Sequence, residues 1–370
     1  MTQTRRAFLS TLPAVLPLTK LQRPAAASRL GIAVCGVGRY ARDWILPALL
    51  HHSTRCRLAG LIEADPQHAR LLGHSLGLPT ECLMGFEDMP QLASQEAIDA
   101  VYVASPTSLH PRHAIAALAA GKHVICRKPM APSSGACRAM IDAAQRQQRL
   151  LVVDYQLHSE PHVQALQRIV AQHTMGLTTS VRSLIGIRRT SIDDPDVRLD
   201  TAGPYPLMNL AVFGIQAACY ATGQVPVTVE SAQLITMRPQ IFGSLPDTMT
   251  WTLRFADGAT ASGEATFTRT QNQLRVEMQR GVVEMEPAFT MRGIQSRING
   301  TLSGGSTTNL MAAFLDHVAQ TLLTNARPTT PGEMGLRDVA IIEAIFSAAK
   351  IKKPVAIDLQ RLSPSKTGRP

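Results

Sequence analysis

The sequence predicts two domains: an α/β domain built on a parallel sheet, and then an α+β domain with a large open, mostly antiparallel sheet. In the first half of the chain, short apolar runs alternate with helical patterns, which is typical of βαβ units. From about residue 248 the period changes, and apolar residues recur at every second position. A length of 370 residues with 45% hydrophobic content is enough for two packed cores rather than one.

The α/β domain is predicted over residues 28–153. Its expected strands are apolar runs at 30–35, 58–62, 100–104, 123–126 and 150–153, and helical patterns fall between them at 43–50, 113–120 and 133–148. Gly121 follows the second helix as a C-cap. The carboxyl ends of parallel strands meet along one edge of the sheet, and open α/β sheets bind their ligands there.

The α+β domain is predicted over residues 154–370. Apolar and polar residues alternate at 249–255, Asp257-Gly258 forms a hairpin turn, and a return strand at 259–267 and a third strand at 274–278 follow. The resulting sheet is polar on one face, so its apolar face must pack on helices or on another subunit. Because apolar faces of this size are rarely exposed on monomers, we expect the chain to associate through this domain.

Two smaller features complete the second domain. Residues 331–338 open a late helix, expected at 336–349, which we predict to pack near the first domain. Residues 303–308 are rich in serine, threonine and glycine and are expected to form an exposed loop.

Residues 1–27 are predicted to be a signal peptide rather than part of the fold. The segment Thr4-Arg5-Arg6-Ala7-Phe8-Leu9 is typical of a twin-arginine export signal, and Ala25-Ala26-Ala27 offers small residues for cleavage before Ser28. An anchor helix is disfavoured because Pro13 and Pro17 interrupt an apolar run that is too short to span a bilayer. We therefore expect export by the twin-arginine machinery to the periplasm, with no stable membrane anchor after processing.

Charge and cysteine usage exclude other classes of function. The formal net charge is +10, but residues 1–27 contain four of the 37 basic residues and none of the 27 acidic ones, which leaves +6 from Ser28 onward. These charges form no run, so nucleic-acid binding is not expected. The six cysteines make no Cys-x-x-Cys pair and no Cys/His metal spacing, which favours buried free thiols and predicts no metal site.

A glycine loop follows the first strand and opens a helix. Gly36-x-Gly38-x-x-Ala41 matches the dinucleotide fingerprint with alanine in the third place. Gly36 allows the tight turn, Gly38 lets the backbone approach a pyrophosphate, and Ala41 permits close helix–strand packing. Glu63 ends the second strand, 22 positions beyond Ala41. This context predicts a Rossmann domain that binds NAD or NADP.

Two residues of the predicted cofactor site favour different dinucleotides. A carboxylate at Glu63 accepts hydrogen bonds from a ribose 2′-hydroxyl and repels a 2′-phosphate, which favours NAD, unless Glu63 is simply a solvated turn residue. Arg39 can pair with a 2′-phosphate, which favours NADP. Both cofactors stay open at this point.

Several segments resemble one family. Residues 101–110 and Arg127-Lys128-Pro129-Met130-Ala131 resemble the signature of the Gfo/Idh/MocA oxidoreductases, and residues 39–47 resemble the glycine loop of glucose–fructose oxidoreductases within it. The resemblance extends over roughly residues 30–355. It implies hydride transfer between a tightly bound NADP or NAD and a sugar or related polyol, in a homodimer or homotetramer.

The resemblance also implies roles for individual residues. Residues 104–110 line the nicotinamide end of the cofactor groove. The implied cofactor contacts are Gly36, Gly38, Arg39, Tyr40, Glu63, Ser105, Pro106, His110 and Lys128. For His110 a second interpretation is equally favoured, namely a helix-entry residue that hydrogen-bonds the backbone. Lys128 binds the reacting hydroxyl or carbonyl and helps to move its proton.

The chain departs from the family at two places. The family usually has glutamate where this chain has Arg127, and it has an aspartate followed four residues later by a tyrosine or histidine where this chain has Asn209 and Phe213. Asparagine can orient a sugar hydroxyl but cannot accept a proton, and Phe213 has no proton to give.

Two functions follow from these departures. In the first, Lys128 and Asn209 catalyse the oxidation or reduction of a sugar. They act alone or with another residue near the substrate that replaces the missing acid/base, such as Tyr155, His158 or Tyr205. In the second, the chain is a catalytically impaired family member that binds a dinucleotide or a sugar without efficient turnover.

Overall fold

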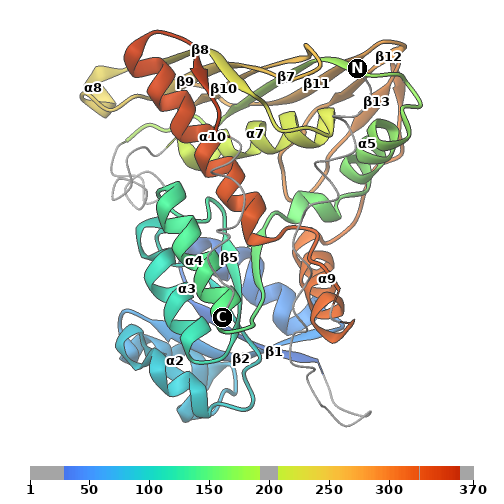
Figure 1. Ribbon diagram of the computed structural model, residues 1–370. Coiled ribbons are helices and arrows are strands. Elements are labelled where there is room, and N and C mark those ends of the chain that lie inside the picture. Colours follow the sequence, from blue (N-terminus) through green and yellow to red (C-terminus); the bar gives the residue numbers. More distant parts are fainter. Residues whose placement is uncertain (1–28, 192–206, 325, 359–370) are drawn as a thin grey trace.

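The first domain is a parallel six-stranded sheet with helices on both faces (Figure 1). The computed structural model describes residues 29–191, 207–324 and 326–358. The strands lie in the order β3-β2-β1-β4-β5-β6, and every pairing is parallel. Their bounds are β1 (Leu30–Cys35), β2 (Cys56–Glu63), β3 (Leu83–Gly85), β4 (Ala100–Val103), β5 (His123–Arg127) and β6 (Leu151–Asp154). The predicted α/β fold is confirmed.

The helices of this domain differ in part from the expected ones. They are α2 (Pro66–Ser75), α3 (His110–Ala119) and α4 (Ser134–Arg146), with short 3₁₀ segments η3 (Thr80–Cys82), η4 (Phe86–Ser94) and η5 (Thr107–Leu109). The expected α-helix at 43–50 is instead a pair of π-type segments, η1 (Ala41–Ile45) and η2 (Ala48–His52). Pro47, between them, has no N–H for an α-helical bond, and the Leu46 N–H reaches back five residues to the Ala41 carbonyl.

The second domain is a nine-stranded, mostly antiparallel sheet in the order β14-β13-β12-β11-β7-β10-β9-β8-β15, with only β7 and β10 paired in parallel. The predicted strands correspond to β9 (Thr248–Arg254), β10 (Thr260–Thr266) and β11 (Gln271–Met278). The others are β7 (Thr178–Gly186), β8 (Thr228–Ile235), β12 (Gly281–Met285), β13 (Ser296–Ile298), β14 (Thr301–Leu302) and β15 (Val355–Ala356). The predicted α+β class is confirmed.

Helices cover the apolar face of this sheet. The helical segments of the second domain are η6 (Gln156–Ser159), α5 (Pro161–Gln172), α7 (Met208–Thr222), α8 (Pro239–Phe242), α9 (Leu310–Thr324) and α10 (Gly332–Ile351). α7 packs on β7 and β10, and glycines make room for the large ring of Trp251 between them. A Cβ on Gly263 would lie 2.1 Å from that ring, and one on Gly214 would lie 2.8 Å from it. The interior of the second domain therefore lies between α7, α10 and the sheet.

The opposite face of the sheet is polar. It carries ion pairs between Arg269 and Glu264 and between Arg275 and Glu277, at 2.5 and 3.0 Å. The apolar face of the sheet was expected to pack either on helices or on another subunit, and in the structure helices of the same chain pack on it. Homo-oligomerisation therefore stays a prediction that rests on the family resemblance.

Two helices connect the domains. α10 is longer than the predicted 336–349, and it packs against α4 and β6 of the first domain as well as β8 of the second. α9 packs on η2 and β2, where Asp316 accepts hydrogen bonds from Ser53 Oγ at 2.5 Å and from the Arg55 N–H at 3.0 Å. Figure 1 shows both helices (orange and red) reaching toward the first domain.

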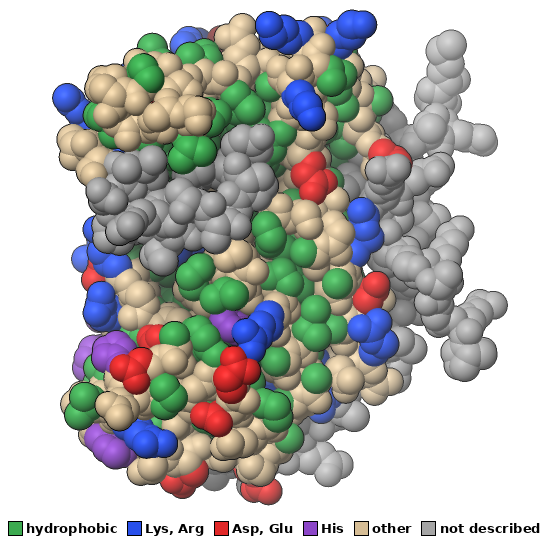
Figure 2. Space-filling model, turned by 90° about the vertical axis from the view of Figure 1, so that its left-hand side faces the viewer, with side chains coloured by type: hydrophobic (Ala, Val, Ile, Leu, Met, Phe, Trp, Pro, Cys, Tyr) green, Lys and Arg blue, Asp and Glu red, His purple; other side chains and the backbone are tan. Residues whose placement is uncertain are grey.

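Other expectations concern the surface and the thiols. All six cysteines are buried free thiols, as predicted. Figure 2 shows acidic and basic side chains interspersed over the lower, first-domain half of one face. Within the described ranges, no helix has the length and apolar character that crossing a bilayer requires, and no cluster of three or more His, Cys, Asp or Glu residues is arranged for a metal ion. The signal peptide predicted at 1–27 lies outside the described residues.

Candidate active site

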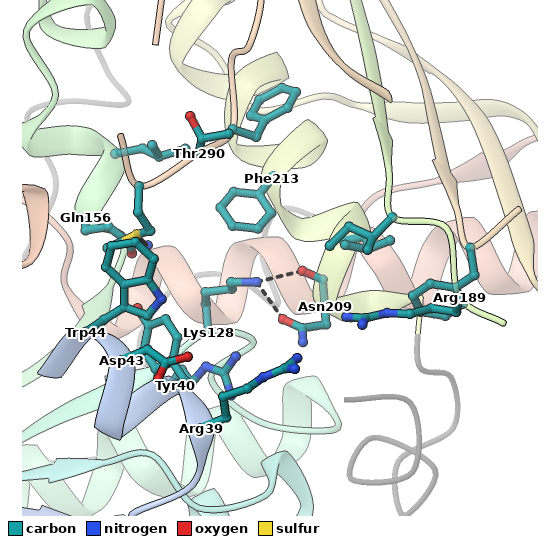
Figure 3. Close-up of a pocket in the computed structure, with 17 residues that line it drawn as sticks. Arg39, Tyr40, Asp43, Trp44, Lys128, Gln156, Arg189, Asn209, Phe213 and Thr290 are labelled. Carbon is teal, nitrogen blue, oxygen red and sulfur yellow. Dashed lines mark hydrogen bonds between the residues drawn. The ribbon is translucent and has the colours of Figure 1, made fainter. Parts of the chain in front are cut away.

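A pocket of about 270 Å³ lies between the domains, where the carboxyl ends of β1, β5 and β6 face α7 (Figure 3). The first domain contributes the start of η1 and the end of β5. The second contributes α7, the segment after β7 and the loop before β13. The described residues of the wall are Arg39, Tyr40, Asp43, Trp44, Arg127, Lys128, Gln156, Leu157, Ile187, Arg189, Asn209, Leu210, Phe213, Phe267, Phe289, Thr290 and Met291.

The glycine loop beside this pocket has the geometry that a dinucleotide requires. Gly36 has φ +91°, and a Cβ there would lie 2.6 Å from the Ser105 backbone nitrogen, so only glycine fits. A Cβ on Gly38 would meet nothing within 4 Å, so the backbone at Gly38 faces open space. Glu63 is not a free turn residue, because its Oε1 accepts a hydrogen bond from the Val37 N–H at 2.5 Å. The residues present therefore fit a pyrophosphate on the loop.

His110 joins two loops rather than facing the pocket. It is 1% exposed, its Nε2 lies 2.7 Å from the Ser105 carbonyl oxygen, and its Nδ1 lies 3.1 Å from the Pro129 carbonyl oxygen. Burial lowers its pKa to about 4, so the ring is neutral near pH 7. Of the two interpretations of His110, the structure supports the helix-entry residue that hydrogen-bonds the backbone. Ser105 is likewise buried, with Oγ 2.8 Å from His113 Nδ1, and neither it nor Pro106 belongs to the described pocket wall.

Lys128, Asn209 and Phe213 meet in the pocket, as the family resemblance implies. Lys128 Nζ donates to the Asn209 carbonyl oxygen at 2.7 Å and to Asn209 Oδ1 at 2.5 Å. It also lies 4.0 Å from the centre of the Phe213 ring, within the range of a cation–π contact. Asn209 and Phe213 stand one turn apart on α7, so they share the helix face that meets Lys128 (Figure 3). The ammonium nitrogen is thus fixed in position by α7.

A second polar cluster, which the sequence did not reveal, lies behind the pocket wall. Asp154 ends β6, stands opposite Arg127 in the β5–β6 register and is completely buried. Its Oδ2 accepts hydrogen bonds from the hydroxyls of Tyr40, at 2.7 Å, and Tyr102. Burial raises the pKa of the Asp154 carboxyl, and the two tyrosine hydroxyls oppose this shift by donating to the charged form.

Tyr40 and Arg127 connect this buried cluster with the pocket wall. The Arg127 guanidinium lies 4.2 Å from the centre of the Tyr40 ring, and both side chains line the wall. Tyr40 therefore contacts Asp154 through its hydroxyl and Arg127 through its ring. An acidic residue at the carboxyl end of a buried strand was the only signal in the sequence for Asp154.

Two of the three suggested substitutes for the missing acid/base, Tyr155 and His158, do not line the pocket beside Lys128. His158 is held between Gln216 Oε1, 2.8 Å from its Nε2, and Gln167 Nε2, 3.0 Å from its Nδ1. Tyr155 is 5% exposed, and burial, followed by the nearby Asp338 carboxylate, raises its pKa well above the ordinary value. Both side chains lie toward α7 and α10, outside the pocket wall, because the η6 turn brings Gln156 and Leu157 into the wall instead. Tyr205 lies outside the described residues.

Comparisons with known proteins agree with this architecture. Two family models match the chain, described as "oxidoreductase family, NAD-binding Rossmann fold" over residues 30–155 and "GFO/IDH/MocA C-terminal domain" over residues 163–284. A crystal structure of aldose–aldose oxidoreductase from Caulobacter crescentus, complexed with glycerol, is similar with a TM-score of 0.83 and 30% identity, covering 89% of this chain and 100% of that one.

More distant relatives match most of the length of the chain. D-xylose 1-dehydrogenase [NADP(+)] of Haloarcula marismortui is 24% identical over 351 residues, which is 91% of this chain and 96% of that protein. An inositol dehydrogenase homologue from Azotobacter vinelandii, solved with NADH and myo-inositol, shares the fold with a TM-score of 0.76 at 18% identity, covering 89% and 98% of the two chains.

The resemblance first noted in the glycine loop and around Lys128 is thus confirmed along both domains. The two matching models together span more than half of the 370 residues. The first domain is an NAD-binding Rossmann domain, and the chain belongs to the Gfo/Idh/MocA family of oxidoreductases.

Proposed function

We propose that this chain transfers a hydride between a bound nicotinamide dinucleotide and a ring or polyol carbon of a sugar-like substrate. The observation that carries this proposal is Lys128, whose nitrogen is fixed by Asn209 in a pocket beside the glycine loop. The names of the relatives, D-xylose 1-dehydrogenase and aldose–aldose oxidoreductase, support an aldose as the substrate class. When bound, the cofactor supplies the nicotinamide ring that accepts or releases the hydride.

Side chains of the protein bind the substrate, position Lys128 and transfer the proton. Lys128 hydrogen-bonds the substrate oxygen on the reacting carbon and exchanges a proton with it. Asn209 holds Lys128 in place through two acceptors, its backbone carbonyl and its side-chain oxygen. The rings of Phe213 and Phe289, 6.1 Å apart between centres, line the pocket and exclude water from the C–H face of the sugar.

The purified protein gives a direct test. Mass analysis of the released ligand identifies a co-purifying NAD or NADP, and near-ultraviolet absorbance shows whether its nicotinamide is reduced. A panel of aldoses and polyols is then mixed with the protein, and oxidation or reduction of the nicotinamide is followed. We expect a stoichiometric nicotinamide and turnover of at least one aldose. A protein that neither carries nor binds a nicotinamide would contradict the proposal.

A second candidate function is supported by one specific observation. The two positions on α7 that face Lys128 hold Asn209 and Phe213, which cannot exchange a proton. A catalytically impaired member that binds a dinucleotide or a sugar without efficient turnover is consistent with that arrangement. Tight cofactor binding together with no turnover across the panel would favour this alternative.

Replacing Gly38 with leucine is expected to abolish cofactor binding without unfolding the protein. No atom of the protein lies within 4 Å of a Cβ at Gly38, so the new side chain occupies the space where a pyrophosphate would approach. Nicotinamide content and thermal unfolding are measured together. Gly304→Leu, in the exposed 303–308 loop, is the matched control, because a Cβ at Gly304 also meets no atom within 4 Å. Gly77 is unsuitable because its φ is +72° and a leucine there would be strained. Unchanged nicotinamide content in Gly38→Leu would refute the fingerprint assignment.

We also propose that the protein is exported to the periplasm in folded form, with its cofactor already bound. The support is the Arg5-Arg6 segment followed by Ala25-Ala26-Ala27. Arg5→Lys with Arg6→Lys is expected to leave an unprocessed protein, about 27 residues longer, in the cytoplasm. Immunoblots of the cell fractions measure this, with Lys20→Arg as the control. Processed double variant in the periplasm would contradict the proposal.

A further inference from the structure

Asp43 is the acidic side chain on the described wall of the pocket, and its carboxylate has no partner in the protein. The side chain is exposed, and within the ranges that the structure describes it makes no hydrogen bond and no ion pair. Other polar groups of the wall are already bonded: the Tyr40 hydroxyl donates to Asp154, and Thr290 Oγ1 donates to the Arg292 carbonyl oxygen at 2.7 Å. Asp43 therefore keeps its full capacity to accept hydrogen bonds from a ligand.

The start of η1 places Asp43 on the pocket wall. Tyr40, Asp43 and Trp44 are three and four positions apart, so they share one face of this π-type segment, and all three line the wall. In Figure 3, Asp43 and Trp44 lie on one side of Lys128, and Asn209 lies on the other. A sugar that fills the pocket between these two sides therefore meets Asp43 with a part other than the carbon that reacts at Lys128.

A ligand that fills the pocket removes water from this carboxylate. A desolvated carboxylate is unfavourable unless hydrogen-bond donors replace the water, and hydroxyl groups are the donors that a sugar offers. Hydrogen bonds from a hydroxyl to a carboxylate are charge-assisted and roughly twice as strong as those between neutral groups. A sugar that lacks a hydroxyl at this place would leave the charge without a partner, so the site should discriminate against it.

We infer that Asp43 determines substrate specificity by accepting hydrogen bonds from one or two hydroxyl groups remote from the reacting carbon, so that fully hydroxylated sugars are preferred to their deoxy counterparts. This inference rests on the proposed function of the same pocket. The ribose hydroxyls of a bound dinucleotide have the same chemistry and are the competing source of donors. The experiment therefore measures the binding of the sugar and of the cofactor separately.

The test pairs Asp43→Ala with sugars that lack single hydroxyl groups. D-Glucose, D-xylose and their monodeoxy analogues are compared by kcat/KM and by calorimetric titration into the cofactor-loaded protein. For the native protein, loss of the hydroxyl that Asp43 binds should cost about 10- to 100-fold, the size of a charge-assisted hydrogen bond. For Asp43→Ala the same analogue should cost no more than about twofold, because the acceptor is already gone.

Two further measurements separate this role from a structural one. A contact remote from the reacting carbon is made in the ground state and the transition state alike, so Asp43→Ala should raise KM and leave the single-turnover rate at saturating sugar within about threefold of native. Asp43→Asn keeps the shape without the charge and should give an intermediate loss. Asp142→Ala removes an aspartate of α4 outside the described pocket wall and, as the matched control, should change neither.

Fluorescence titration of NADH into protein freed of cofactor completes the test, and its affinity should be the same in Asp43→Ala and native. Equal costs of every deoxy analogue in the two proteins would overturn the inference. Lower NADH affinity with unchanged sugar costs would overturn it as well, and would assign Asp43 to a cofactor ribose. So would a single-turnover rate lowered by about 10² or more, because Asp43 would then exchange a proton. Native protein that binds neither sugar would overturn both this inference and the proposed aldose class. The expected pattern seen by calorimetry without any turnover would support the inference and refute only the proposed hydride transfer.

Discussion

Replacing Lys128 with methionine is expected to lower kcat for sugar oxidation by about 10² to 10⁴, the size of a positioned general acid/base. Methionine keeps much of the unbranched apolar stem, so packing beside Phe213 is largely preserved, while the nitrogen that contacts Asn209 is lost. The effect should fall on kcat and kcat/KM together, because the proton is moved in the transition state. Single-turnover reduction of the bound nicotinamide measures the chemical step directly.

Two controls separate chemistry from folding in this experiment. Lys350→Met removes an exposed lysine near the end of α10, far along the chain from the pocket, and should leave kcat unchanged. Because Lys128 is also an implied cofactor contact, the nicotinamide content of Lys128→Met is measured in parallel and kcat is expressed per bound nicotinamide. A Lys128→Met variant with kcat within about threefold of native would show that another group moves the proton.

What the sequence predicted well were features that depend on local pattern. The glycine loop and the strand ends follow from the rule that the carboxyl ends of parallel strands share an edge. The meeting of Lys128 with α7 was implied by the family resemblance, and helix geometry adds only that Asn209 and Phe213 share one face. α2 and β3 were not predicted. α2 carries a recognisable start, Asp65 as N-cap before Pro66, whereas β3 has three residues and is too short to show any period.

The parts of the site that the sequence missed depend on contacts between distant residues. Asp154 binds Tyr40 and Tyr102, which are 114 and 52 positions away, so no local pattern marks the cluster. The suggestion of Tyr155 and His158 failed for a related reason. They are adjacent in sequence to Gln156 and Leu157, which line the pocket, but the η6 turn directs them to α7 and α10 instead. The direction of a side chain on a short 3₁₀ turn is set by packing.

Restoring the family pair is expected to raise turnover by about 10² or more, which is the typical contribution of an added general acid/base. Asn209→Asp places a carboxylate oxygen where Oδ1 already lies 2.5 Å from Lys128 Nζ, so the new charge pairs with the ammonium and can accept a proton. Phe213→Tyr keeps the ring that lies 4.0 Å from Nζ and adds a hydroxyl that can donate one. The ring is half-buried and lines the pocket, so the hydroxyl has room.

The two single variants complete a double-mutant cycle that separates independent effects from cooperation. If the carboxylate and the hydroxyl relay one proton, the double variant should exceed the product of the two single gains. Turnover is measured on neutral aldoses and on uronates, because a new carboxylate at position 209 should weaken binding of acidic substrates by like-charge repulsion while still accelerating neutral ones. Cofactor content should not change, because neither residue lies on the glycine loop. If the native chain already turns over aldoses rapidly and the double variant is no faster, the proton is transferred by groups other than those at positions 209 and 213 on α7. The hydroxyl of Tyr40 on Asp154 would then be the next group to remove.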